Sequence, residues 1–524
     1  MSTPGAYFRL LRAGWILARE GVFAALPGDQ LTGPAHLAWR LSRLVARRRS
    51  KDDSRSARMS QAVDRLGPSY VKLGQFLATR PDVVGADVAM DLAELQDRMS
   101  TFPREIAVTS IEESLGRKLD DLFISFGEPI AAASIAQVHP ADIERDGLPT
   151  KVAVKAIRPG VRRRFFNDLE SYFLAARLQE RFMPSSRRLR PVEVTRTLAQ
   201  TTKIEMDLRL EAAALSELGE NIRHDPGFRV PWVDWERTGR DVVTMEWIDG
   251  IKMSNIDALR EAGHDLNALS VTVIQSFLRH TLRDGFFHAD MHPGNLFVEA
   301  DGTIVAVDFG IVGRLGKKER RFLAEILYGF IRRDYLRVAE VHFEAGYVPP
   351  IHDVHAFAQA IRAIGEPIHG QPAETISMAR LLALLFEVTE IFDMQARPEL
   401  VLLQKTMVVV EGVARNLNPS FNMWKAAEPV VGDWIQGNLG PRGFLEDTRD
   451  GALALVSLAR QAPELAARAE RLSREIDTMA EKGLRFDEET AEAIGKSEAR
   501  HSRSGRIALW VIAVTLVWIA LQMG

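Results

Sequence analysis

The sequence has no cysteine among its 524 residues. Disulfide bonds, thiolate nucleophiles, cysteine-based zinc sites and iron–sulfur clusters are therefore excluded. An excess of one charge is also lacking, because 67 Lys and Arg residues stand against 70 Asp and Glu residues, for a formal charge of −3. A chain with this balance is not expected to coat nucleic acid, so we predict no nucleic-acid partner.

The chain also lacks the compositional bias of fibrous or disordered proteins. Hydrophobic residues make up 46% and charged residues 26%, with 37 Gly and 24 Pro, which is close to the globular average. No internal repeat of fixed period is visible. The length allows about three domains, or one large two-lobed domain with appended segments.

The N-terminal segment lacks the uninterrupted apolar run of a secretory signal, because charged residues interrupt residues 7–26. Its apolar residues instead recur at helical spacing, which predicts an amphipathic helix. The residues expected on its apolar side are Phe8, Leu11, Trp15, Ile16 and Val22. Such a helix either packs on its own protein or lies on a membrane surface, and the sequence leaves both interpretations open.

One long uncharged run is present, at the C-terminus. Residues 507–524, IALWVIAVTLVWIALQMG, contain no charged residue, and at about 1.5 Å per residue they reach about 27 Å, close to the hydrocarbon thickness of a bilayer. Basic residues precede this run within residues 496–506, which by the positive-inside rule places the body of the protein in the cytoplasm. We therefore expect a C-terminal single-pass anchor. The alternatives are a buried core helix and an oligomer contact.

The densest chemistry lies in residues 286–310, FFHADMHPGNLFVEADGTIVAVDFG. Two β-prone stretches flank an Asp-Gly turn there, which predicts an antiparallel hairpin. Asn295 at its entrance and Asp308 at its exit then lie at the same open end, and Asp290 is in range from the preceding loop. A carboxylate and an amide oxygen facing one point suit Mg²⁺, so Asn295 and Asp308 are the predicted metal ligands.

Protein kinases arrange the same groups in this way. Their catalytic-loop Asp and Asn follow a D-x-x-x-x-N spacing, and a D-F-G aspartate comes after a hairpin. Here Asp290 with Asn295, and Asp308 with the two residues after it, match both patterns. Asp290 is therefore the candidate catalytic residue that activates a hydroxyl or a water. A transition-metal site at His288, Asp290 and His292 is the alternative, but it leaves Asn295 and Asp308 without a role.

Upstream, residues 151–157 (KVAVKAI) contain the V-A-V-K pattern that carries a phosphate-pairing lysine, so Lys155 is the second predicted catalytic residue. Its carboxylate partner is expected to be Glu211, with Glu205 as the alternative. The segment before it is rich in alanine where a kinase has glycines, and a Cβ narrows the backbone angles that wrap phosphates. The residues expected to contact the nucleotide there are Ala131, Ala132, Ala133, Ser134, Ile135, Ala136, Gln137 and Val138.

Two further stretches bear on the nucleotide site. Residues 245–248 end a strand-like run, and we expect Glu246 and Ile248 at a hinge where adenine meets backbone groups. After Gly310, few residues remain before a helix-like run begins at Lys317, and no A-P-E motif follows. A long activation segment that could dock a protein hydroxyl is therefore not expected. The predicted cofactors are ATP and Mg²⁺.

These residues resemble the UbiB family of atypical, kinase-like proteins, most clearly over residues 60–320. The most specific marker is the tetrapeptide KLGQ at 72–75, which matches the family's K-x-G-Q motif. The resemblance implies that this motif lies on a helix over the active site, facing an E-x-D pair that anchors it, where a peptide substrate would otherwise dock. The residues of the two motifs are Lys72, Gly74, Gln75, Glu205 and Asp207.

A strand-rich unit followed by a larger helical unit is typical of an α+β protein. With the resemblance, it implies a protein-kinase-like two-lobed fold with an N-terminal helical extension and a C-terminal transmembrane helix. The expected segments are an N-terminal helical segment (1–60), a K-x-G-Q helical extension (61–125), a kinase-like small lobe with a helical insert (126–250), a helical large lobe (251–440), an amphipathic helical linker (441–505) and a transmembrane tail anchor (506–524).

The resemblance also implies a function. It is that of a Mg²⁺-dependent ATP-binding protein, an ATPase or a small-molecule phosphotransferase, which supports ubiquinone biosynthesis at the inner membrane. The expected partners are the membrane, an isoprenoid or quinone-intermediate lipid and other quinone-biosynthesis proteins. The alternative is a nucleotide-sensing scaffold or lipid-handling chaperone for those enzymes, in which phosphotransfer is not essential.

Overall fold

The structure is a computed structural model. It describes residues 4–22, 40, 44–46, 55–78, 84, 88, 91–92, 101–132, 135–182, 190–370, 388, 391–394 and 398–439. By contacts the chain divides into two units, Met1–Gln436 and Gly437–Gly524, and the elements below belong to the first, apart from the end of the last helix. The predicted Ala133, Ser134, linker (441–505) and tail anchor (506–524) lie outside the described residues. Within the described residues, no helix is both long enough and apolar enough to cross a bilayer.

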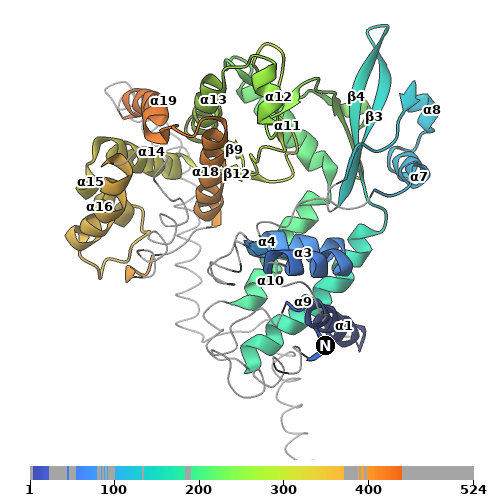
Figure 1. Cartoon of the computed structure of the whole chain (residues 1–524), viewed down its shortest axis with the longest axis horizontal. Coiled ribbons are helices and arrows are strands. Elements are labelled where there is room, and N and C mark those ends of the chain that lie inside the picture. The colour runs from blue at the N-terminus through green and yellow to red at the C-terminus, as the bar shows by residue number, and fades with distance from the viewer. Residues whose placement is uncertain are drawn as a thin grey trace, which may run out of the picture. The chain divides into compact units, whose positions relative to one another are not determined.

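The N-terminal extension is helical, as expected. Its helices are α1 (Pro4–Arg19), α3 (Arg55–Leu66) and α4 (Pro68–Ala78). Helix α1 packs against α9 (Val161–Phe182) and α3, and α4 packs against α3 and α9 (Figure 1). The extension is therefore attached to the body mainly through α9.

The structure buries only part of the predicted apolar side of the N-terminal segment: Val22 is buried and Ile16 is half-buried. Ala6 and Ala13 are buried, whereas Phe8, Leu11 and Trp15 are 70%, 73% and 54% exposed. A helix on a globular protein normally turns its large apolar residues inward. In α1 the small residues Ala6 and Ala13 are the buried ones, and Phe8, Leu11 and Trp15 face solvent.

A six-stranded sheet forms the small lobe, in the order β1-β3-β4-β7-β6 with β2 paired to β3. The strands are β1 (Ser125–Phe126), β2 (Ala131–Ala132), β3 (Ala136–Arg145), β4 (Leu148–Ile157), β6 (Val233–Asp234) and β7 (Val242–Glu246). Strands β3 and β4 form a long hairpin. Its turn residues Asp146 and Gly147 have φ angles of 53° and 76°, the left-handed conformation of a two-residue Asp-Gly turn.

The two faces of this sheet are covered differently. One face packs its apolar residues, among them Val152 and Val154, under α7 (Arg104–Leu115) and α8 (Leu119–Leu122). The other face carries Lys155 and joins the main core of the chain. The helical insertion that the sequence predicts after Lys155 is present. It consists of α9 and α10 (Pro191–Glu205), and α11 (Leu208–Asn221) comes after it.

Two small sheets build the start of the large lobe. One has the order β5-β11-β10-β8, and the other pairs β9 with β12. The strands are β5 (Phe228–Arg229), β8 (Ile251–Lys252), β9 (Phe286–His288), β10 (Leu296–Val298), β11 (Ile304–Ala306) and β12 (Val312–Arg314). Strands β10 and β11 form the hairpin that the Asp-Gly turn predicts. The β9–β12 pair was not predicted, because three residues are too few to show alternation.

Helices complete the large lobe. They are α12 (Ile256–Glu261), α13 (Leu266–Arg279), α14 (Lys317–Arg332), α15 (Tyr335–Glu344), α16 (Val354–Gly370), α18 (Pro398–Leu417) and α19 (Met423–Asn438). Helix α13 packs against α18, and α15 packs against both α14 and α16 (Figure 1). Buried residues of both lobes, such as Val243 and Phe287, belong to one core cluster, so the elements that meet at the site below are fixed by a shared core.

Candidate functional site: a buried lysine between two carboxylates

Lys155 lies at the centre of a buried charge cluster. It projects from β4 and is 8% exposed. Its Nζ donates hydrogen bonds to the two carboxylate oxygens of Glu211 at 2.8 and 3.0 Å, and to Oδ1 of Asp308 at 2.8 Å. Glu211 stands in the first turn of α11, and Asp308 follows β11. The structure therefore brings together three elements at this lysine, and it pairs Lys155 with Glu211 rather than with Glu205. We call these three residues the Lys155 cluster.

Burial and charge act against each other in the Lys155 cluster. Burial alone would lower the pKa of Lys155, but the carboxylates of Asp308 and Glu211 raise it well above its usual value. Burial would raise the pKa of Asp308, yet Lys155, with His288 and Lys72, lowers it. Burial raises the pKa of Glu211 against the attraction of Lys155. Asp308 is therefore ionised at neutral pH, as a ligand of a hard cation must be.

The β10–β11 hairpin brings Asn295 to the same end as Asp308. The backbone N–H of Val307 donates to the carbonyl of Asn295 at 2.9 Å, one residue before Asp308. Asn295 is 9% exposed, and its Nδ2 donates to the carbonyl of Asp290 at 3.1 Å. With Nδ2 occupied, the amide oxygen is the atom that remains for a cation. An amide oxygen beside an ionised carboxylate is a donor set that fits Mg²⁺.

Asp308 has an unusual backbone conformation. Its φ angle is 64°, in the left-handed region that residues other than glycine seldom adopt. Such a conformation persists only where the surroundings impose it, and it is common at functional sites. Here the following residue, Phe309, is 1% exposed, and its ring centroid lies 4.4 Å from that of His288. The buried Phe309 thus fixes the direction in which the Asp308 carboxylate points.

Two histidines shape the loop that carries Asp290. His288 is buried, its Nδ1 accepts from the N–H of Asp290 at 3.2 Å, and its Nε2 donates to the carbonyl of Val307 at 3.3 Å. Burial lowers the pKa of His288, so the ring is neutral. His292 accepts from the N–H of Gly294 at 3.0 Å. Within the described residues, no group of three or more His, Asp or Glu side chains is arranged to bind a metal, so the transition-metal alternative gains no support.

A residue that the sequence did not point to supports the same loop. Thr406, on α18, is buried, and its Oγ1 lies within hydrogen-bond distance of two carbonyls, that of Ala289 at 3.0 Å and that of Leu402 in its own helix at 2.8 Å. Thr406 and Ala289 are 117 positions apart, and no local pattern connects them. Helix α18 therefore helps to set the position of the backbone next to Asp290.

Comparison with known proteins identifies the family. Residues 94–342 match the ABC1 atypical kinase-like domain, and residues 361–422 match the UbiB helical domain. The "Probable protein kinase UbiB" of Marinobacter nauticus is 39% identical over 462 residues, which cover 87% of this chain and 83% of that protein. The chain belongs to the UbiB family. The "Probable protein kinase UbiB" of Pseudomonas aeruginosa is 40% identical over 405 residues, 76% of this chain and 75% of that protein. A solved structure of Rv3197 with erythromycin, from Mycobacterium tuberculosis, aligns with 73% of this chain and 98% of that chain, at 24% identity and a TM-score of 0.48.

The residues of the site and of its support are distributed over the two family domains. The Lys155 cluster, Asp290 and Asn295 all lie within the ABC1 atypical kinase-like domain, a kinase-like domain that implies ATP binding. Thr406 lies within the UbiB helical domain. In this UbiB-family chain, the second domain therefore contacts the loop that carries Asp290 in the first.

The K-x-G-Q motif of this UbiB-family chain lies on α4, in the extension. Lys72 forms an ion pair with Glu205, the last residue of α10, and the two side chains are 13% and 11% exposed. The charge of Lys72 also contributes to the lowered pKa of Asp308. Gly74 is buried and Gln75 is half-buried.

Asp207, the second acid of the E-x-D pair, has a different role. Its Oδ1 accepts from the N–H of Arg209 at 3.3 Å, and its Oδ2 pairs with the guanidinium of Arg209 at 2.7 Å. Asp207 is therefore the N-cap of α11, the helix that carries Glu211. A cap at this position stabilises the first turn of that helix, so Asp207 acts on Glu211 rather than on the K-x-G-Q helix.

The alanine-rich segment contributes to both faces of the small-lobe sheet. Val138 is directly opposite Lys155 in the β3–β4 register and shares its face. Gln137 points to the opposite face, where its amide accepts from the N–H of Phe102 at 2.9 Å and donates to the carbonyl of Phe102 at 3.1 Å. The Gln137 side chain therefore fixes the chain before α7. Of the other predicted residues, Ala131 and Ala132 form β2, and Ile135 and Ala136 are buried.

The predicted hinge carries an ion-pair network. Glu246 ends β7, and its carboxylate pairs with Arg229 of β5 at 2.8 and 3.0 Å. Arg229 also pairs with Glu299 of the β10–β11 turn at 2.7 Å. The Glu246 side chain thus links the small-lobe sheet to the large lobe. Ile248 is half-buried in the connection between β7 and β8. The backbone N–H of Glu246 donates to the carbonyl of Trp232 at 2.9 Å, so contact of this group with a base stays a prediction.

Proposed function

We propose that this chain is a Mg²⁺-dependent ATPase or small-molecule phosphotransferase of the UbiB family that supports ubiquinone biosynthesis at a membrane. The observation that carries the proposal is the Lys155 cluster, in which a buried lysine contacts the D-F-G aspartate and a helix glutamate at once. That geometry presents one cation and one ionised carboxylate to the same point, as transfer of a phosphoryl group requires.

In this proposal each residue has one task. Lys155 would contact the phosphates of ATP and orient them, and Glu211 keeps Lys155 in place. Asn295 and Asp308 would bind Mg²⁺, which when bound neutralises charge on the phosphates. Asp290 would accept the proton of the attacking water or hydroxyl. Most of the rate enhancement would come from positioning, because phosphoryl transfer needs little covalent participation by the protein.

Protein kinase activity is a weaker candidate, although curated relatives carry that name. After Gly310 the chain forms β12 at Val312–Arg314 and begins α14 at Lys317. Strand β12 is paired with β9, so this segment is already part of a sheet. Little chain is left to form a docking surface for a peptide. A small acceptor or water fits this arrangement better.

The membrane part of the proposal rests on sequence. The uncharged run at 507–524 would anchor the chain in the inner membrane with its catalytic body in the cytoplasm. From there the chain would meet an isoprenoid or quinone-intermediate lipid and other quinone-biosynthesis proteins. Comparing the whole chain with one that ends before Arg506, with and without membranes, tests this part. We expect truncation to lower quinone content while soluble ATP turnover persists; unchanged quinone content would contradict the anchor's role.

A second candidate is a nucleotide-sensing scaffold or lipid-handling chaperone in which phosphotransfer is incidental. It is favoured by one observation, the hydrogen bond from Lys155 to Asp308. Two groups that are already paired in this way suit tight binding of a nucleotide as well as its turnover.

The variants Lys155→Ala and Asp308→Asn separate the two functions. We expect both variants to lose Mg·ATP binding, ATP turnover and quinone production together. Normal quinone content in cells that carry only these variants would favour the scaffold function and contradict the enzymatic one. Asp301→Asn, at an exposed turn of the same hairpin, is the matched control and should behave as the unaltered chain.

A further inference from the structure

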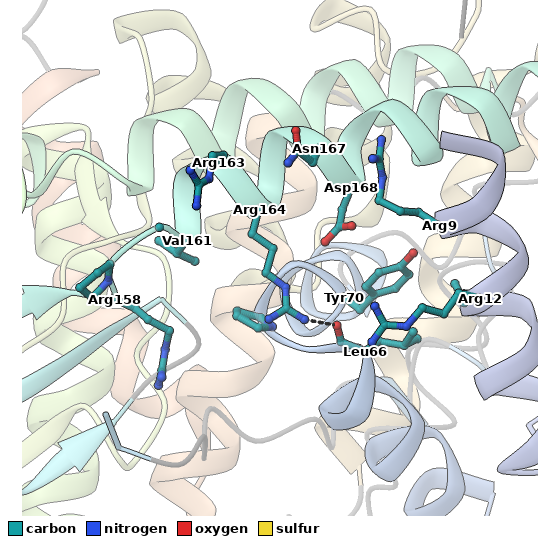
Figure 2. A pocket seen from close by; sticks show the side chains of 14 residues that line it. Arg9, Arg12, Leu66, Tyr70, Arg158, Val161, Arg163, Arg164, Asn167 and Asp168 are labelled. Carbon is teal, nitrogen blue, oxygen red and sulfur yellow. Dashed lines mark hydrogen bonds between the residues drawn. The ribbon is translucent and has the colours of Figure 1, made fainter. Parts of the chain in front are cut away.

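A cavity outside the nucleotide site is lined by arginines (Figure 2). It has a volume of about 570 Å³ and lies among α1, α4 and the start of α9. We call it the arginine pocket, after Arg9, Arg12, Arg158, Arg163 and Arg164. Asp168 is the one carboxylate among its lining residues, and no residue of the Lys155 cluster lines it. The pocket is therefore separate from the site proposed for ATP.

The guanidinium groups crowd one another. The pKa of Arg158 is lowered by burial and then by the charge of Arg164. Burial and the carboxylate of Asp168 raise the pKa of Tyr70, on the pocket wall, to about 12, whereas Arg9, Arg12 and Arg164 act to lower it. The pocket lining holds five arginines against one carboxylate, Asp168, so positive charge is in excess and a bound anion would relieve the repulsion among the arginines.

Part of this positive charge is available to a ligand. Arg9 pairs with Glu170 at 2.9 Å, and Arg164 donates to the carbonyl of Leu66 at 2.7 Å. Arg12 and Arg163 are exposed, and within the described part of the chain they form no hydrogen bond or ion pair. Arginine donors in a planar fork suit the oxygens of a phosphate.

The start of α9 adds to the attraction. This helix has 22 residues and begins at Val161, on the pocket wall. The first N–H groups of a helix lack partners within the helix, and its dipole makes that end positive. The arginines and the helix end therefore favour the same kind of ligand, a group with several negative oxygens.

The helix that supplies Arg9 and Arg12 also exposes an apolar stripe. Phe8, Leu11 and Trp15 recur at spacings of three and four residues and are all more than half exposed. A helix with aromatic and leucine side chains on one side and arginines beside them has the composition of a helix that lies in a membrane surface. A soluble phosphate compound would not account for this stripe.

We propose that the arginine pocket binds the phosphate of an anionic lipid headgroup, with α1 lying in the surface of the bilayer and its apolar stripe among the acyl chains. The phosphate comes from a lipid because the pocket and the stripe share one helix. This contact is independent of the C-terminal run and does not depend on the activity proposed above.

The absence of cysteine from the sequence permits a test that observes α1 itself in the whole chain. Leu11→Cys is labelled with an environment-sensitive fluorophore and mixed with vesicles of phosphatidylcholine or of phosphatidylcholine with phosphatidylglycerol. We expect a blue shift and a gain in emission that saturate with the anionic vesicles and are much smaller with phosphatidylcholine alone. The same label at Glu261→Cys, on exposed α12, should not respond.

A charge variant tests the pocket. Arg12→Gln/Arg163→Gln removes two exposed guanidinium groups, and each basic residue near an anionic surface contributes about a fivefold factor. The apparent affinity of labelled α1 for the anionic vesicles should therefore fall about thirtyfold. Arg223→Gln/Arg332→Gln removes two exposed arginines elsewhere and should change the affinity less than about threefold, with the same thermal stability.

Three results would overturn the proposal. The first is an equal response of the label to neutral and anionic vesicles, and the second is an affinity unchanged by Arg12→Gln/Arg163→Gln. The third concerns the source of the phosphate. If inorganic phosphate alone raises the melting temperature of the whole chain, the double variant abolishes that rise and vesicles leave the label unchanged, the pocket binds a soluble anion instead.

Discussion

Two charged regions of this chain, the Lys155 cluster and the arginine pocket, differ in whether their positive side chains are buried and paired with carboxylates of the same chain. In the cluster, the lysine is buried and bonded to two carboxylates of the same chain. In the pocket, Arg12 and Arg163 are exposed and form no such pair within the residues described. A buried charge needs a partner in the fold, whereas an exposed one is satisfied by water. Substitutions in the cluster should therefore change stability and activity together, and those at the pocket should change only ligand binding.

The largest effect that tests this difference is expected at Asp308. Asp308→Asn keeps the shape of the side chain but removes the ionised ligand and one partner of Lys155. ATP turnover measured by phosphate release should fall by a factor on the order of 10²–10³, as when one charge-stabilising group is removed from an active site. Turnover within a few-fold of the unaltered chain would show that Asp308 does not act on the phosphates.

Lys155→Ala should have the second largest effect, and on stability. It leaves the buried carboxylate of Glu211 and the partly exposed carboxylate of Asp308 without their cation, and loss of the partner of the buried Glu211 costs about 3–5 kcal/mol in unfolding free energy at pH 7. The pH dependence has a definite sign. The pKa of Asp308 is lower in the folded chain than in the unfolded chain, so its contribution to stability is present above the unfolded pKa and is lost as pH falls. The pKa of Lys155 is raised by folding, so its contribution is lost only at high pH.

The difference in stability between the two proteins should therefore shrink as pH falls from 7 towards 4, because the unpaired carboxylates of the variant take up protons. Urea unfolding at several pH values measures it. Lys151→Ala, at an exposed lysine of the same strand whose Nζ lies over the ring of Trp247, is the control and should cost no more than about 1 kcal/mol. A loss that stays constant with pH would mean that charge does not cause it.

Thr406→Val tests the support that the second domain gives to the Asp290 loop. The change keeps the shape of the side chain and removes a hydroxyl whose one proton is shared between the carbonyls of Ala289 and Leu402, which costs about 1–2 kcal/mol. We expect this loss in thermal unfolding, together with slower ATP turnover at unchanged nucleotide affinity. Thr109→Val removes a similar bond on an exposed helix and should lie within about 0.5 kcal/mol of the unaltered chain.

A smaller effect is expected for the pair that connects the K-x-G-Q helix to α10. A double-mutant cycle of Lys72→Ala and Glu205→Ala should give a coupling of about 1 kcal/mol, because both side chains are mostly buried. The same cycle at the exposed pair Arg260–Asp257 should give nearly zero. Equal couplings would mean that burial does not strengthen the first pair.

The smallest effect is expected on the outward side of α1. Phe8→Ser and Trp15→Ser should each change the unfolding free energy by no more than about 0.5 kcal/mol, because these side chains are exposed. Ala6→Leu, at a fully buried position of α1 that does not line the arginine pocket, should destabilise the chain by about 1–3 kcal/mol through overpacking. A large loss for Trp15→Ser would show that the stripe belongs to the core.

Much of the site could be predicted because its signals are local. The Asp-Gly turn determines the β10–β11 hairpin, and the hairpin in turn brings Asn295 to the end where Asp308 lies. The direction of Gln137 could not be predicted, since strand alternation does not say which face of the small-lobe sheet is covered by α7. Thr406 could not be predicted either, because its bond to Ala289 depends on the packing of α18 against α13.

The orientation of α1 shows a different limit. Its large apolar residues mark a face by periodicity, but periodicity does not say what covers that face. The residues that α1 buries are instead Ala6 and Ala13, whose side chains are too small to stand out in a hydrophobic pattern. Only the packing of α1 on its neighbouring helices shows which side of α1 is buried.

The dependence of ATP affinity on Mg²⁺ tests the central claim most directly. Calorimetric titration of ATP into the whole chain, with Mg²⁺ or with a chelator, measures it for the unaltered chain and for Asn295→Ala. The account predicts that Mg²⁺ raises the affinity of the unaltered chain at least about tenfold, roughly 1.4 kcal/mol, and that the gain largely disappears in the variant. An affinity independent of Mg²⁺, or a gain that Asn295→Ala leaves intact, would contradict it.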